Sequence, residues 1–123
     1  MADIKIPVAL TLHKQSRVLE IGYDDGTVFN LPFEFLRVYS PSAEVRGHGV
    51  GQEVLQTGKR NVLITAIEPV GNYALKPHFS DGHNTGIYTW DYLYRLGAQR
   101  EVLWNDYLRR LHEAGLDEEN GRN

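Results

Sequence analysis

The sequence of 123 residues contains no cysteine. Disulfide bonds are therefore excluded, and so is any zinc or iron–sulfur site whose thiolate ligands would come from this chain. The sequence also lacks an apolar run long enough to span a membrane, and its first residues lack the basic segment and apolar run of a signal peptide. We therefore expect a cytoplasmic protein that does not contact the membrane.

An excess of charge is also missing from most of the chain. The net charge is −3, and residues 113–123 hold four of the 16 acidic residues but only one of the 13 basic residues. Without this segment the chain has 12 residues of each sign. Because nucleic-acid binding depends on a basic face, a body without net charge predicts no nucleic-acid partner.

Alternating apolar residues and turn signals predict several antiparallel strands. In residues 17–23 one face is apolar, and the turn Asp24-Asp25-Gly26 joins this strand to another over residues 27–31 as a hairpin. Further strands are expected over residues 8–12, 61–69, 72–80 and 83–88, with turns at Gly71-Asn72 and Asp81-Gly82.

Two helices are predicted after the strands. Thr89 caps a helix over residues 90–96 that stops at Gly97, and a helix over residues 100–114 stops at Gly115. Residues 33–40 lie between two prolines and form either a single helical turn or irregular backbone. Residues 42–60 are rich in glycine and predict a long ordered loop, with one helical turn near residues 53–56.

Strands that precede helices, without βαβ alternation, predict an α+β fold. In this fold antiparallel β-hairpins form a twisted sheet, and the helices are segregated toward the C-terminus. The length fits one domain, which we expect to cover residues 1–115 including the C-terminal helix. Residues 116–123 are expected to form a disordered acidic tail.

No group of residues completes a catalytic or metal site. His78, Asp81 and His83 have the composition of a non-haem iron triad, but strand geometry points His78 and Asp81 to opposite faces. Residues 51–60 superficially resemble a phosphate-binding loop, yet six residues separate the glycines instead of four, and Arg60 replaces the magnesium-binding Ser or Thr. We therefore expect no catalytic or cofactor-binding residues, and no enzyme.

Several motifs together indicate a family. They are LRVYSPSAEV at 36–45, GHG at 47–49, LQTGKR at 55–60, IEPVGNY at 67–73 and DGHNTGIYTW at 81–90. With these motifs, residues 5–97 resemble the gamma-butyrobetaine hydroxylase-like N-terminal domain family, whose small stand-alone bacterial members were catalogued as a domain of unknown function. In the hydroxylases this domain precedes a separate iron- and 2-oxoglutarate-dependent catalytic domain. The resemblance covers the N-terminal module alone and so implies no oxygenase activity.

The resemblance also implies a degenerate zinc site. The hydroxylases bind structural zinc through the pattern Cys-x-Cys-x-x-Cys and a later histidine. In this sequence the cysteine positions fall on Ser40, Ser42 and Val45, and the histidine position falls on His83. A hydroxyl is a poor zinc ligand and valine is none. We therefore expect a folded protein without bound metal.

The resemblance favours a role in binding. Related domains are fused to Mrp-type P-loop ATPases that carry iron–sulfur clusters. We therefore hypothesise a non-catalytic protein-binding or adaptor module, accessory to iron–sulfur cluster or iron metabolism, with a P-loop iron–sulfur carrier as its partner. The alternative is a metal- or small-molecule-binding accessory domain related to 2-oxoglutarate oxygenases, using His83 with His48 or His78. The expected interaction surface joins the long loop to the histidine turn: Arg46, His48, Lys59, Arg60 and His83.

Overall fold

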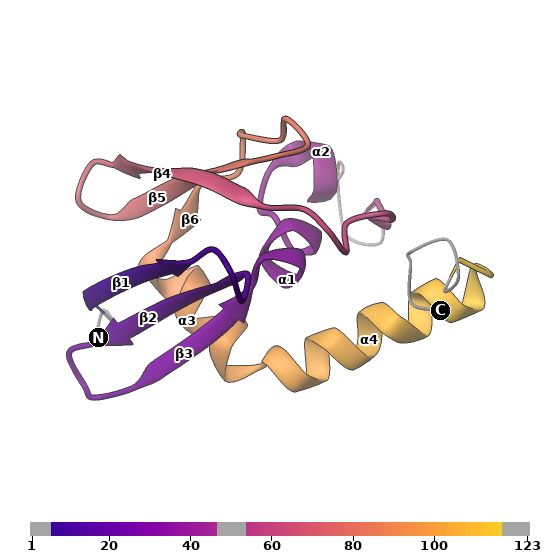
Figure 1. Cartoon of the computed structure of the whole chain (residues 1–123). Coiled ribbons are helices and arrows are strands. Elements are labelled where there is room, and N and C mark those ends of the chain that lie inside the picture. The colour runs from indigo at the N-terminus through magenta and orange to yellow at the C-terminus, as the bar shows by residue number, and fades with distance from the viewer. Residues whose placement is uncertain (1–5, 47–53, 117–123) are drawn as a thin grey trace.

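The structure is a computed structural model and describes residues 6–46 and 54–116. Within these residues, strands form two antiparallel three-stranded sheets, ordered β1-β2-β3 and β4-β5-β6 (Figure 1). The strands are β1 Pro7–His13, β2 Val18–Tyr23, β3 Val28–Pro32, β4 Ile64–Val70, β5 Ala74–Phe79 and β6 Tyr88–Thr89. The helices are α1 Phe33–Val38, α2 Ala43–Arg46, α3 Trp90–Ala98 and α4 Arg100–Glu113.

The first sheet is organised by the alternation of β2. Leu19, Ile21 and Tyr23 are buried, whereas the residues between them are partly exposed. Leu19 pairs with Leu31 across the sheet, and Ile21 pairs with Phe29. Apolar side chains of β2 and β3 therefore lie on one side of the sheet and face the core.

The second sheet consists of one long hairpin and a short third strand. β4 and β5 form the expected hairpin, with Gly71 at a φ of +53° in the turn. The predicted strand over residues 83–88 is reduced to β6, which pairs with β5 through Leu75 and Tyr88. The hairpins therefore belong to two sheets instead of one, although the α+β class is confirmed.

Helix α1 confirms the helical interpretation of residues 33–40. It follows β3 directly at Pro32, whose φ of −60° suits a residue that precedes a helix. Phe33, Phe35 and Leu36 are buried in the core cluster that joins both sheets and α3. The hydroxyl of Tyr88 donates a hydrogen bond to the Leu36 carbonyl, which ties α1 to the second sheet.

The N-terminal end of α3 was predicted correctly and its C-terminal end was not. The Tyr92 N–H donates to Thr89 Oγ1 at 3.1 Å, so Thr89 is the cap. Gly97 does not stop the helix, which continues to Ala98. Its missing side chain instead lets Phe29 approach, because a Cβ on Gly97 would lie 2.3 Å from Phe29 Cγ. Gly97 therefore marks the contact of α3 with β3.

Helix α4 ends at the predicted glycine. Gly115 has a φ of +71°, its N–H donates to the His112 carbonyl, and the Leu116 N–H donates to the Leu111 carbonyl. This pair of hydrogen bonds is the Schellman motif. A second, smaller buried cluster of Val38, Tyr107 and Leu111 holds α4 against α1.

The long segment after α1 contains helix α2, which the sequence did not predict. Residues 54–56 are not helical, and residue 53 lies outside the described residues. The predicted acidic tail also lies outside them, apart from residue 116. In residues 6–46 and 54–116, no helix combines the length and the apolar character needed to cross a bilayer.

Candidate functional site

His83 and the two serines of the degenerate zinc positions lie together in the interior. His83 is 6% exposed, on the loop between β5 and β6, and its Nε2 lies 2.7 Å from Ser40 Oγ and 3.4 Å from Ser42 Oγ. The serines follow α1 and are also buried. The Ser42 N–H donates to Ser40 Oγ, which fixes the turn. Val45, the fourth position, is buried on α2.

These residues do not fit a zinc ion. The Nε2 atom that would bind the metal already forms a hydrogen bond with Ser40, and Val45 offers no donor atom. Among the described residues, no group of three or more acidic or histidine side chains has the arrangement of a metal site. The cluster of Ser40, Ser42 and His83 is thus a set of hydrogen bonds that joins the start of the long segment to the β5–β6 loop.

His78, Asp81 and His83, which have the composition of an iron triad, do not converge on one site. His78 lies on β5 and its Nε2 is 3.0 Å from Glu68 Oε1 on the neighbouring strand. Asp81 binds Arg37 and Lys59 instead. With His83 directed to the serines, the three side chains have three different sets of partners, as strand geometry predicted.

Asp81, in the β5–β6 loop, is the centre of an ionic network. Its Oδ2 accepts hydrogen bonds from Arg37 Nε at 2.9 Å and Lys59 Nζ at 2.7 Å, and its Oδ1 accepts from the His83 N–H. Arg37 is 7% exposed and also donates to Gln56 Oε1. Burial opposes ionisation of Asp81, but the hydrogen bonds from Lys59, His83 and Arg37 outweigh it and lower its pKa to about 2.

We predict that Asp81 makes the protein sensitive to acid. Because its pKa falls from 3.8 to about 2 on folding, its contribution to stability is present above about pH 4 and is lost as the pH falls toward 2. Because the side chain is partly exposed, we expect this loss to be about 1–2 kcal/mol of unfolding free energy. When the free energy of unfolding in urea is measured between pH 2 and 7, it should change less with pH in Asp81→Asn than in the wild type. The exposed turn variant Asp24→Asn serves as the control and should follow the wild-type profile.

The predicted interaction surface is only partly represented among the described side chains. His83 lies in the interior, and Lys59 is held by Asp81 at 2.7 Å, so both contribute to the fold. Arg60 is exposed. The side chain of Arg46 and the whole of His48 lie outside the described part of the structure, as do residues 51–53 of the stretch that resembles a phosphate-binding loop.

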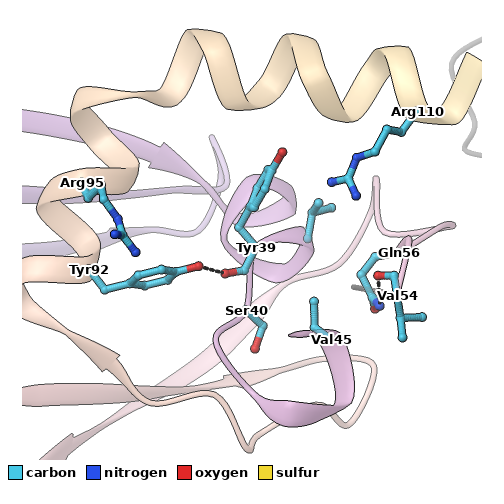
Figure 2. A pocket seen from close by; sticks show the side chains of 9 residues that line it. Tyr39, Ser40, Val45, Val54, Gln56, Tyr92, Arg95 and Arg110 are labelled. Atoms are coloured by element: carbon cyan, nitrogen blue, oxygen red, sulfur yellow. Dashed lines mark hydrogen bonds between the residues drawn. The ribbon is translucent and has the colours of Figure 1, made fainter. Parts of the chain in front are cut away.

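A cavity of about 200 Å³ adjoins the serine–histidine cluster through Ser40. It is bounded by the four helices and by the segment that contains Val54 and Gln56 (Figure 2). Arg95 on α3 and Arg110 on α4 border it, and we call it the Arg95–Arg110 cavity. The residues that line it are Val38, Tyr39, Ser40, Val45, Val54, Gln56, Tyr92, Arg95 and Arg110.

Two tyrosines fix the side of the cavity formed by α1 and α3. The Tyr92 hydroxyl donates to the Tyr39 carbonyl at 2.6 Å, as Figure 2 shows. The Tyr39 hydroxyl donates to the Leu103 carbonyl of α4 at 2.7 Å. The guanidinium carbon of Arg95 lies 5.5 Å from the centroid of the Tyr92 ring, in cation–π contact. Among the described residues, Arg95 is therefore held in place by an aromatic ring and not by a carboxylate.

Arg110 borders the opposite end of the cavity (Figure 2). Its Nε atom is buried and has no hydrogen-bond partner among the described residues, although Asp106 Oδ2 lies 3.3 Å away. Burial raises the pKa of Tyr39, and the hydrogen bond and positive charge of Arg110 oppose this rise. Arg110 is thus close to the hydroxyl of Tyr39.

Sequence reasoning did not identify this cavity. Arg95 and Arg110 belong to different helices, and neither spacing nor composition distinguishes them from other exposed cations. The linear signal that existed was the arginine three residues after Tyr92, a spacing that places the two side chains on one helical face. The connection at Gln99 between α3 and α4 then brings Arg110 to the same cavity.

Comparison with known proteins agrees with the fold. The family model described as "Gamma-butyrobetaine hydroxylase-like, N-terminal" matches residues 10–94. The chain therefore belongs to this family, as its motifs indicated. Among curated proteins, none matches the chain.

Solved structures similar to the chain include two NMR structures and one crystal structure. Two NMR solution structures are each 52% identical, with TM-scores of 0.79 and 0.80; they cover 92% and 94% of this chain and 89% and 86% of their own. A crystal structure of a protein with unknown function from Acidithiobacillus ferrooxidans ATCC 23270, which belongs to the DUF971 family, is 44% identical with a TM-score of 0.62. That match covers 75% of this chain and 92% of the other.

Proposed function

We propose that this chain is a non-catalytic binding module of the cytoplasm that contacts another protein. The observation that carries the proposal is the Arg95–Arg110 cavity, in which two guanidinium groups stand beside apolar and aromatic side chains on a scaffold of four helices. Arginine and tyrosine are the side chains that most often dominate binding energy in protein interfaces. The site combines both types.

The size of the cavity favours a side chain as its occupant. Pockets for drug-sized ligands and cofactors measure about 300–1,000 Å³, whereas this cavity measures about 200 Å³. A space of this size suits one or two side chains of a partner. We therefore favour a protein partner over a cofactor.

Two buried polar residues that line the cavity help to hold its shape. Ser40 and Gln56 line the cavity and are both buried, and each forms a hydrogen bond with another buried side chain, His83 and Arg37 respectively. Groups held in this way position the backbone around a binding site.

The proposed partner is a protein of iron–sulfur cluster or iron metabolism, in particular a P-loop iron–sulfur carrier. Support for this identity comes from the family, whose domains are also fused to such ATPases. Neither nucleic acid nor membrane is proposed as a partner, because the body of the chain has no net charge.

Affinity capture from the native host, with chemical crosslinking and mass spectrometry, tests the proposal. The wild-type chain should enrich one partner reproducibly, and the crosslinks should surround the Arg95–Arg110 cavity. A partner that carries a P-loop and a cysteine-ligated cluster would support the iron–sulfur role. If the wild-type chain enriches no protein over a bait-free control, the proposed function is wrong.

The alternative function, a metal-binding accessory domain, makes an opposite prediction about metal. We expect the protein purified without a histidine tag to be folded and free of stoichiometric zinc or iron, because His83 Nε2 is engaged by Ser40. Native mass spectrometry and elemental analysis measure this directly. Stoichiometric metal that disappears in His83→Ala, with the fold retained by circular dichroism, would favour the alternative.

A further inference from the structure

We propose that the Arg95–Arg110 cavity binds an acidic peptide segment of the partner, with one carboxylate at Arg95, a second at Arg110, and an apolar side chain between them. This inference rests on the proposed function and specifies the chemistry of the segment that the module recognises. Arginine guanidinium groups bind carboxylates with paired, charge-assisted hydrogen bonds.

Arg95 is available for such a contact. It is exposed, and its one side-chain contact recorded among the described residues is the stacking on Tyr92 at 5.5 Å. Stacking restricts the guanidinium group without using its N–H donors, which stay free to bind an anion. Tyr92 is itself tied to the Tyr39 carbonyl, so the position of Arg95 is prepared before a ligand binds.

Arg110 has only partial compensation of its charge. Asp106 lies 3.3 Å from its Nε, but that contact is not a hydrogen bond. Asp106 also accepts a hydrogen bond from Arg109 at 2.6 Å, and Arg109 binds Glu113 as well. Asp106 is therefore shared between two arginines, and among the described residues the buried Nε of Arg110 has no hydrogen-bond acceptor, which is unfavourable.

The described residues that line the cavity are aliphatic, aromatic, neutral polar or basic. None of the nine lining residues is acidic, and Val38, Val45 and Val54 supply aliphatic surface. The two guanidinium groups stand at opposite ends, with Tyr39 and Tyr92 between them (Figure 2). Two separated carboxylates flanking an apolar side chain match this order. A peptide carries that pattern on one chain, whereas a small acid such as acetate reaches one arginine at a time.

Fluorescence anisotropy with labelled pentapeptides tests the inference. The full-length chain should bind the peptide ELELE, capped at both ends, and should not bind QLQLQ with measurable affinity. The double variant Arg95→Ala/Arg110→Ala should bind ELELE at least tenfold more weakly. The matched control Arg100→Ala removes a cation from the same helix, outside the cavity lining, and should change the dissociation constant by less than twofold.

Amide chemical shifts locate the contact. On titration with ELELE we expect saturable shifts at residues 38–40, 54–56, 92–95 and 110, with urea midpoints showing that each variant remains folded. Equal weakening in Arg100→Ala and in the double variant would show nonspecific charge attraction and would overturn the inference. Glutarate that binds as tightly as ELELE would identify a small-acid site instead, and would also overturn it. If neither ELELE nor glutarate binds, the inference is also overturned.

The failure of this inference is distinguishable from failure of the proposed function. If the wild-type chain and Arg95→Ala/Arg110→Ala capture the same partner equally well from the host, the proposed function stands and the acidic-segment inference falls. If the wild-type chain captures no partner but binds ELELE through the two arginines, the cavity chemistry stands and the role as a protein-binding module falls.

Discussion

Replacing Tyr107 with alanine should lower the free energy of unfolding by about 3–5 kcal/mol. Tyr107 is fully buried in the small cluster that holds α4 against α1, and its hydroxyl donates to the Gln56 carbonyl at 2.7 Å. The substitution removes a large buried ring and leaves a cavity. Equilibrium unfolding in urea, followed by far-UV circular dichroism, measures the loss.

The variant Tyr107→Phe separates the contribution of the hydroxyl from that of the ring. It keeps the packing and removes the donor to Gln56, so we expect a loss of about 1–2 kcal/mol. Because α4 carries Arg110 into the Arg95–Arg110 cavity, Tyr107→Phe should retain binding of the acidic peptide when folded. A loss below about 1 kcal/mol for Tyr107→Ala would contradict the buried position of this ring.

Replacing Gly97 with alanine should destabilise the protein by about 2 kcal/mol. In an exposed helix the same change stabilises by about 1 kcal/mol, because alanine has the higher helix propensity. Here the added Cβ would lie 2.3 Å from Phe29 Cγ, so either α3 or the ring of Phe29 must move. The sign of the effect, measured by urea unfolding, therefore tests the contact between α3 and β3.

A double-mutant cycle with Phe29→Ala gives the control for Gly97→Ala. Without the ring of Phe29 the steric conflict is absent, and Gly97→Ala should then stabilise the protein by up to about 1 kcal/mol. The coupling between the two positions should consequently exceed 2 kcal/mol, within the range observed for residues in contact. Destabilisation of equal size in both backgrounds would show that steric contact with Phe29 is not the cause.

Gly97 also shows where sequence reasoning reached its limit. Glycine after an apolar helical segment is the usual signal of a helix end, and at Gly115 this interpretation was confirmed by a φ of +71°. At Gly97 the same residue type serves a close contact with another element. The two roles cannot be separated from local sequence, because the partner ring of Phe29 lies 68 positions earlier in the chain.

The candidate site was also predicted only in part from the sequence. Family motifs identified Ser40, Ser42 and His83 as positions that belong together, and the structure places their side chains within hydrogen-bond reach. The surface predicted from Arg46, His48, Lys59, Arg60 and His83 rested on the cationic and polar side chains of the long loop and on the family pattern that brings residues 40–45 close to His83. His83 is instead buried, and Lys59 is paired with Asp81.

Local periodicity, backbone preferences and contiguous motifs were enough to predict the order of the strands, helices α3 and α4, the hairpin turns, the stop of α4 at Gly115 and the family. The division of the hairpins into two sheets and the shared cavity of Arg95 and Arg110 became known from the structure. Both features depend on contacts between segments far apart in the chain. Such contacts arise when the elements pack to bury a common core, and no local pattern specifies them.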